Sequence, residues 1–213
     1  MHDKTSIEGI AAPLLIDNLD TDQIMPKQFL RIITKQGLDK GVLYDLRFKP
    51  DGTPKPDFIL NQDAYRNAKI LVAGPNFGCG SSREHAVWGL QQLGVEVVIA
   101  ASFGEIFFGN ALNNRLLPIV LDQAQIDSLL REISTPSGNR LSVDLETMEV
   151  RSVNGHTYPF TLGARHRQMI TQGLDMVGAT LRQMNEIVAF EDGHFSRNSW
   201  MRGLHVTPGP LES

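Results

Sequence analysis

Three short apolar runs alternate with two helical patterns in the middle of the chain, and this alternation restricts the fold more than any other feature. The runs cover residues 69–73, 95–101 and 116–121, and each has the length of a buried strand. Helical spacing begins at Ser81 after the first run and at Ser102 after the second, where it continues to about Asn113. This order predicts a parallel sheet with right-handed crossovers.

The first of these helices carries recognisable end signals. Ser81 and Glu84 have the spacing of a capping box, and Gly94 stands where a C-terminal cap belongs. The helix is therefore expected to run from Ser81 to Gly94. Pro118, inside the third apolar run, indicates an edge strand or a bulge because proline cannot donate a hydrogen bond within a sheet.

The rest of the chain predicts a second, mostly antiparallel layer. Hydrophobic residues alternate with a period of two after residue 140, and Asn154-Gly155 predicts a tight hairpin. Residues 9–16 are a plausible partner for these strands. Further helical patterns cover residues 123–133, 165–172 and 176–190. The predicted fold class is α/β, with a parallel α/β core beside an antiparallel layer.

The predicted organisation is one domain over residues 1–192, followed by a loosely held tail over residues 193–213. No internal repeat or low-complexity tract divides the chain. Residues 41–61 contain three prolines and two glycines, which predicts an exposed loop.

Composition excludes several classes of protein. The 213 residues include 24 acidic and 20 basic side chains, a net charge of −4, which gives no polybasic surface for nucleic acid or anionic lipid. No membrane span or signal peptide is evident, so a cytoplasmic protein is expected. The single cysteine, Cys79, cannot form an internal disulfide and cannot alone hold an iron-sulfur cluster or a structural zinc. No metal site is predicted.

The stretch GPNFGCGSSREHA, residues 74–86, carries the candidate chemistry. A phosphate-binding loop of the Walker type needs a lysine after its last glycine, and the dinucleotide-binding fingerprint needs a glycine where Arg83 stands. Neither serine lies in the Gly-x-Ser-x-Gly pattern of a serine hydrolase. Cys79 as a nucleophile would need an imidazole nearby, and a packing role is the alternative for this thiol.

What remains is an anion site at the start of a helix. A strand, a glycine-rich turn, two hydroxyl groups and Arg83 together favour a carboxylate ligand. The same surroundings would stabilise a deprotonated Ser81, which could then remove a proton from a carbon next to a carboxylate. The alternative is purely structural: Ser81 caps the helix, Arg83 and Glu84 are solvated, and His85 is a histidine of the surface or core whose hydrogen bonds are satisfied.

Several motifs resemble one known family. The segments DNLDTDQIMPKQFL, NFGCGSSREHAVWGL, VVIAASFGEIFFGNALNNRLLPIVL and GLDMVGATL occur in the order and spacing of small subunits of 3-isopropylmalate dehydratases, within the aconitase family. The resemblance covers residues 16–190. It implies a three-layer β/β/α swivelling domain that docks on a large subunit carrying a [4Fe-4S] cluster. No cofactor would be bound by this chain itself.

The implied activity is that of a hydro-lyase subunit in leucine biosynthesis. It would interconvert 2-isopropylmalate and 3-isopropylmalate through isopropylmaleate, and only together with the large subunit. A related dehydratase acting on methylmalate-citraconate or dimethylmalate is one alternative. A noncatalytic module that only binds a carboxylate is another.

The resemblance also implies roles for individual residues. Ser81 falls on the base that takes the proton from carbon, and Ser82 and Arg83 fall on residues that bind substrate. Thr21 and Asp22 match positions that border the active site. The following loop would set substrate choice, with an apolar wall for the isopropyl group or, alternatively, a stripe that packs on the core. Its residues are Met25, Pro26, Phe29, Leu30, Arg31 and Ile32. Met25 and Arg115 depart from the residues usual in the family.

Overall fold

The computed structural model describes residues 5–30, 36–135 and 137–203. The chain divides into two compact units, residues 1–175 and residues 176–213, which are described separately. Unit 1 holds the sheet and the candidate chemistry, and the described residues of unit 2 are mostly helical. The prediction of one domain over residues 1–192 with a tail over residues 193–213 stays a prediction.

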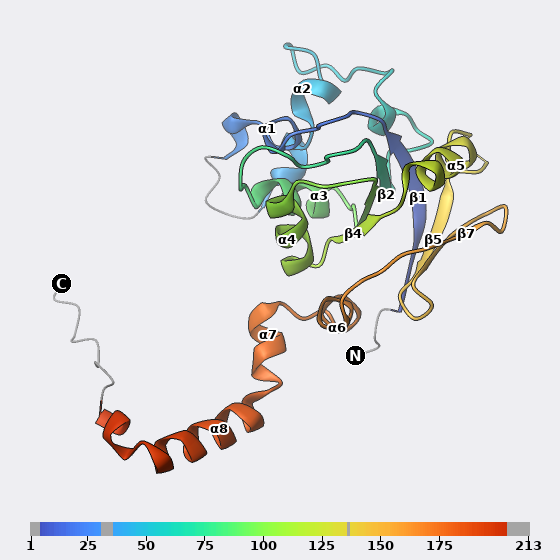
Figure 1. The fold of residues 1–213 in the computed structure, drawn as a ribbon. Coiled ribbons are helices and arrows are strands. Elements are labelled where there is room, and N and C mark those ends of the chain that lie inside the picture. Colours follow the sequence, from blue (N-terminus) through green and yellow to red (C-terminus); the bar gives the residue numbers. More distant parts are fainter. Residues whose placement is uncertain (1–4, 31–35, 136, 204–213) are drawn as a thin grey trace. The chain divides into compact units, whose positions relative to one another are not determined.

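The described residues of unit 1 form a seven-stranded mixed sheet in the order β4-β3-β2-β1-β5-β6-β7. The strands β1 to β4 pair in parallel, and β1, β5, β6 and β7 pair antiparallel. Figure 1 shows β1 between β2 and β5, where it joins the two parts. The bounds are β1 Ser6–Leu14, β2 Ala68–Ala73, β3 Val97–Ala100, β4 Leu117–Val120, β5 Arg140–Asp144, β6 Glu149–Ser152 and β7 Thr157–Pro159. The predicted α/β class with parallel and antiparallel parts is confirmed.

Helices follow the strands in the predicted order. Those of unit 1 are α1 Thr21–Ile24, α2 Tyr44–Arg47, α3 His85–Gln92, α4 Glu105–Asn113, α5 Gln123–Ile133 and α6 Ala164–Gln172, with 3-10 turns at Lys27–Phe29, Leu38–Gly41 and Ile59–Asn61. The α5 bounds agree with the predicted range, and Asp122 with Gln125 makes a capping box at its start. β4, which contains Pro118, lies at the edge of the sheet as predicted.

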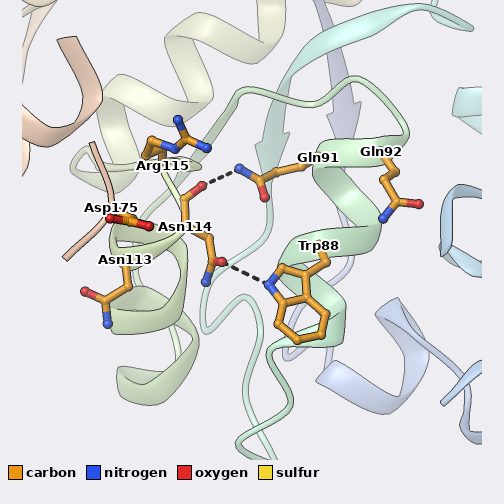
Figure 2. A pocket seen from close by; sticks show the side chains of 7 residues that line it. All are labelled: Trp88, Gln91, Gln92, Asn113, Asn114, Arg115 and Asp175. Atoms are coloured by element: carbon orange, nitrogen blue, oxygen red, sulfur yellow. Dashed lines mark hydrogen bonds between the residues drawn. The ribbon is translucent and has the colours of Figure 1, made fainter. Parts of the chain in front are cut away.

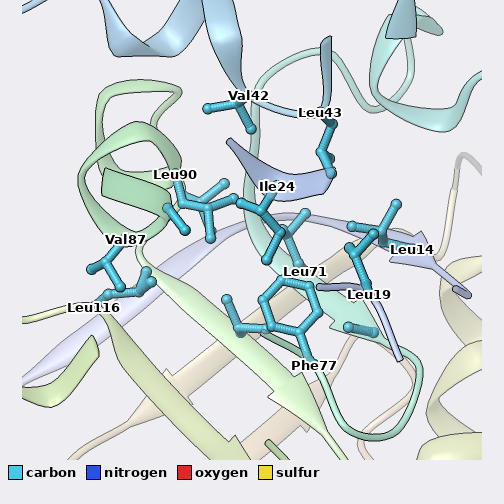
Figure 3. Packing of buried hydrophobic residues seen from close by; sticks show 14 of the residues in the cluster. Leu14, Leu19, Ile24, Val42, Leu43, Leu71, Phe77, Val87, Leu90 and Leu116 are labelled. Atoms are coloured by element: carbon cyan, nitrogen blue, oxygen red, sulfur yellow. The ribbon is translucent and has the colours of Figure 1, made fainter. Parts of the chain in front are cut away.

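The sheet is covered on both faces. Along β2, Leu71 and Ala73 belong to one hydrophobic cluster, whereas Ile70 and Val72 belong to another. Because successive side chains of a strand point to opposite faces, the two clusters lie on opposite sides of the sheet. Figure 3 shows side chains from α1, α3 and β2 meeting in the first cluster, around Phe77. This cluster lies beneath the glycine-rich stretch.

Both helices of the parallel core begin later than predicted. Helix α3 begins at His85, and its N-cap Glu84 makes no side-chain capping bond, so the predicted capping box of Ser81 and Glu84 is wrong. The Glu84 carboxylate instead accepts a hydrogen bond from Asn114 Nδ2 at 2.5 Å. Helix α4 begins at Glu105 rather than at Ser102. At the other end of α3, Gly94 has φ +99° and follows the C-cap Leu93, as predicted.

The segment of residues 41–61 is only partly the predicted exposed loop. It contains α2 and a 3-10 turn, and Val42 and Leu43 are fully buried in the first cluster. The ring of Tyr44 lies 5.1 Å from that of Phe29 and 4.9 Å from that of Phe48, measured between centroids. Hydrophobic contacts therefore hold this proline-containing segment to the body.

The described part of unit 2 contains helices α7 and α8 where one helix was predicted over residues 176–190. Helix α7 spans Met176–Leu181, α8 spans Met184–Arg197, and a 3-10 turn follows at Ser199–Gly203. Gln183 is the N-cap of α8, so the helical pattern is interrupted there. Among the residues described in either unit, no helix is long and apolar enough to cross a membrane.

Candidate active site

Three loops meet at the carboxyl ends of the parallel strands β1, β2 and β3. The amide of Gly78 donates to Leu19 O at 2.7 Å, and the amide of Thr21 donates to Cys79 O at 3.0 Å. On the other side, the amide of Phe77 donates to Ser102 O at 3.1 Å. The glycine-rich loop after β2 is thus fixed between the loops that follow β1 and β3. In parallel sheets this edge is where ligands bind.

Gly78 allows the close approach of this loop to α4. Its φ is +72°, a left-handed conformation that favours glycine. A Cβ atom at this position would lie 2.3 Å from Cγ of Phe107, whose ring is buried. The loop conformation that presents Ser81 therefore depends on the absence of a side chain at position 78.

Ser81 is held by Thr21, which lies sixty residues away in the sequence. The Oγ atoms of the two residues are 2.9 Å apart, and Thr21 Oγ1 also lies 3.1 Å from Ser81 O. Thr21 is 1 % exposed, whereas Ser81 is partly exposed. A threonine hydroxyl has one proton to donate. When the Thr21 hydroxyl donates this proton to the Ser81 carbonyl, the Ser81 hydroxyl donates to Thr21 Oγ1. When Ser81 has lost its own proton, the Thr21 hydroxyl can donate to the Ser81 alkoxide instead.

Asp22 forms an ion pair with Arg83, so neighbouring residues of α1 hold two residues of the glycine-rich loop. Lys27 Nζ lies 3.8 Å from the other carboxylate oxygen of Asp22. The carboxylate of Asp22 thus contacts the guanidinium of Arg83 directly. Ser82 lies between the two held residues and is exposed.

Asn114 contacts the N-cap of α3 and two residues within that helix, and no local sequence signal singled it out. Its Nδ2 donates to Glu84, its Oδ1 accepts from Trp88 Nε1 at 2.9 Å, and its carbonyl accepts from Gln91 Nε2 at 2.5 Å. Figure 2 shows the last two of these bonds at the wall of a pocket of about 360 Å³. The pocket is lined by Trp88, Gln91, Gln92, Asn113, Asn114, Arg115 and Asp175. Ser81 and Arg83 are not among them.

Comparison with known proteins agrees with this geometry. The family model of the aconitase C-terminal domain matches residues 1–124. A 3-isopropylmalate dehydratase small subunit 1 from Chromobacterium violaceum is 54% identical over 200 residues, which cover 94% of both chains. The chain belongs to the 3-isopropylmalate dehydratase small-subunit family.

Other relatives give the same family. A small subunit 1 from Mannheimia succiniciproducens is 48% identical over 93% of this chain and 98% of its own. The crystal structure of a 3-isopropylmalate dehydratase from Methanocaldococcus jannaschii is 29% identical, covers 87% of this chain and 99% of its own, and superposes with a TM-score of 0.64. The α/β swivel fold of the family is thereby confirmed for this chain.

In this member of the family, Cys79 is a partly buried free cysteine. Its thiol donates to Asn18 O at 3.3 Å, and Cys79 pairs with Asp20 in an isolated β-bridge. The ring of His85 lies 4.8 Å from the Trp88 ring, measured between centroids. The packing role of the thiol stays a prediction. Among the described residues, no group of His, Cys, Asp and Glu side chains is arranged to hold a metal ion.

The predicted specificity loop is divided between core and surface. Met25 is fully buried, and a Cβ atom at Gly89 on α3 would lie 2.2 Å from its Cε, so this side chain packs in the core; Pro26 is buried too. Phe29 and Leu30 are partly exposed and pack against the first cluster. Arg31 and Ile32 lie outside the described residues.

We expect Thr21→Val to lower kcat by about tenfold, with little change in KM, when the small subunit is assembled with its large subunit. Valine keeps the shape of the side chain but removes the hydroxyl that contacts Ser81. Thr21→Ser keeps the hydroxyl and should restore most of the kcat. The measurement is steady-state kinetics on both variants. A Thr21→Val enzyme with a wild-type kcat would show that this contact does not position Ser81.

Proposed function

We propose that this chain is the small subunit of a hydro-lyase that interconverts 2-isopropylmalate and 3-isopropylmalate through isopropylmaleate, in leucine biosynthesis. The observation that carries the proposal is the contact of Ser81 with the buried hydroxyl of Thr21. Ser81 lies on the glycine-rich loop, which also presents Arg83. A hydroxyl so placed fits removal of a proton from a carbon acid, and an arginine fits binding of a carboxylate.

In the proposed reaction the Ser81 alkoxide, stabilised by a hydrogen bond from the Thr21 hydroxyl, takes the proton from the substrate carbon and becomes a neutral hydroxyl, while the electron pair of the C–H bond stays on the substrate. Arg83 binds a substrate carboxylate in two-point fashion, while Asp22 holds the guanidinium in place. The exposed Ser82 hydroxyl adds a further hydrogen bond to the substrate. In the reverse direction Ser81 returns the proton to the carbon.

The departing hydroxyl group needs a Lewis acid, which the [4Fe-4S] cluster of the large subunit would supply. We therefore propose that the enzyme is heteromeric. We also propose that it is cytoplasmic and that residues 1–192 act as a swivelling domain. Phe29 and Leu30, at the surface of the specificity loop, are the described candidates for contact with the isopropyl group.

The test is reconstitution from separately purified subunits. The small subunit alone and the large subunit alone should not dehydrate 3-isopropylmalate, whereas the mixture should. Methylmalate and dimethylmalate, offered to the same mixture, should react much more slowly. Turnover by the small subunit alone, or no turnover by a complex with an intact cluster, would contradict the proposal.

A further inference from the structure

Unit 2 has helices but no core of its own. None of the described residues 176–202 is buried. Helices α7 and α8 have 6 and 14 residues, and isolated helices of about this length are marginal in water. Large apolar side chains are exposed on this unit: Met176, Val177, Leu181, Met184, Val188, Phe190 and Trp200. Stable helices here require a surface on which these side chains pack.

Five of these residues form what we call the C-terminal apolar face: Met176, Val177, Leu181, Met184 and Val188. On α7 the first three line, with Thr180, a groove of about 270 Å³. On α8 Met184 and Val188 are four residues apart and therefore on the same side of the helix. Val177 is 66% exposed and Val188 is 45% exposed.

We propose that the C-terminal apolar face docks on the large subunit. The inference rests on the proposed function for the existence of that partner. Most of this segment is shared with a small-subunit relative and is not peculiar to this chain. The alignment with the Chromobacterium violaceum small subunit covers 200 of the 213 residues, so at least 25 of the 38 residues of unit 2 lie within it.

The size of the face favours a partner that also contacts other parts of the chain. Half-exposed aliphatic side chains contribute tens of Å² each, so the five together expose on the order of 300 Å². A stable interface needs about 800 Å² per partner. The face is thus too small to hold a complex alone, and it fits one part of a larger interface.

A second copy of this chain fits the face poorly. If Met184 and Val188 occupied the d and a positions of a heptad, the following d and a positions would be Glu191 and Phe195. A parallel pair of α8 helices would then bury two Glu191 carboxylates against each other, which is costly without a cationic partner. A different protein surface can receive Met184 and Val188 without burying Glu191.

The experiment uses the full-length small subunit with glutamate at one apolar position, either Val177→Glu or Val188→Glu. Affinity for the purified large subunit is measured by calorimetry, and turnover is measured at saturating large subunit. We expect each variant to raise Kd by about tenfold or more, because each places a charge in an apolar contact. We expect kcat at saturation and the melting temperature of the partner-free chain to stay at their wild-type values.

Ser196→Glu is the matched control, because it adds the same charge to an exposed polar position of α8. It should leave Kd unchanged. The proposal is overturned if Val177→Glu and Val188→Glu bind as tightly as wild type. It is also overturned if the variants lower the melting temperature of the partner-free chain, which would mean that the face packs on unit 1. Loss of self-association would overturn it as well, because the face would then pack on a second copy of this chain. The affinity is measured by calorimetry, without turnover. A failure of the proposed reaction would therefore not affect the outcome of this binding test.

Discussion

Replacing Ser81 by alanine is expected to abolish turnover in the assembled enzyme while leaving substrate binding largely intact. Loss of the group that takes the proton should lower kcat by about a thousandfold or more. Arg83 and its ion pair with Asp22 remain to bind a carboxylate. Ser81 does not cap α3, and Thr21 Oγ1 keeps its contact with the carbonyl of residue 81. The free energy of unfolding should therefore fall by only about 1 kcal/mol.

Ser82→Ala is the matched control for this variant. Ser82 is the exposed neighbour of Ser81, and in the proposed reaction it binds substrate without taking the proton. This change should raise KM more than it lowers kcat. Turnover, ligand binding and thermal stability are measured on one preparation of each variant. Wild-type turnover by Ser81→Ala, with only a lower melting temperature, would show that Ser81 is structural.

Replacing Gly78 by alanine should destabilise the fold through two separate effects. Alanine at φ +72° is strained by about 1 to 2 kcal/mol. Its Cβ would also overlap the buried ring of Phe107, at 2.3 Å from Cγ. Together these effects should cost about 3 kcal/mol or more of the free energy of unfolding. The loop should shift, and activity in the assembled enzyme should fall with it.

Gly155→Ala separates the two causes. Gly155 has φ +85°, but a Cβ atom there would meet no atom within 4 Å. Only the conformational strain remains, so the loss should be about 1 kcal/mol. Urea unfolding of both variants measures the difference. Equal losses would mean that the Phe107 ring moves aside freely and that Gly78 is not needed for the loop conformation.

Local sequence signals predicted much of the fold. The range of α5 follows from its own apolar spacing and from a capping box within the helix, so no distant contact is needed to define it. The same is true of the hairpin at Asn154-Gly155, where Gly155 has φ +85° and its amide donates to Ser152 O at 3.1 Å. Signals of this kind are complete within a few residues.

The start of α3 could not be predicted in this way, because a tertiary contact competes with a local signal. Ser81 and Glu84 have the spacing of a capping box, but Thr21 contacts Ser81 and Asn114 binds Glu84. The same long-range contacts define the candidate site. The family resemblance brought Thr21 and Asp22 to attention, but only the folded chain pairs them with Ser81 and Arg83.

The specificity loop shows a second limit of sequence patterns. Met25 and Phe29 are both apolar, yet Met25 is fully buried beside Gly89 whereas Phe29 is partly exposed. Hydrophobicity alone does not distinguish a side chain that packs in the core from one that faces a ligand. The difference arises from α3 and the 3-10 turn at Leu38–Gly41, which close over Met25.

Hydration of isopropylmaleate in D₂O tests most directly whether Ser81 transfers the proton. The wild-type small subunit, assembled with its large subunit, should form a product with a new C–D bond, because Ser81 delivers a hydron that exchanges with solvent. The Ser81→Ala enzyme, shown by calorimetry to bind isopropylmaleate, should form this bond about a thousandfold more slowly or not at all. Formation of the C–D bond at the wild-type rate would contradict the assignment of Ser81 as the base.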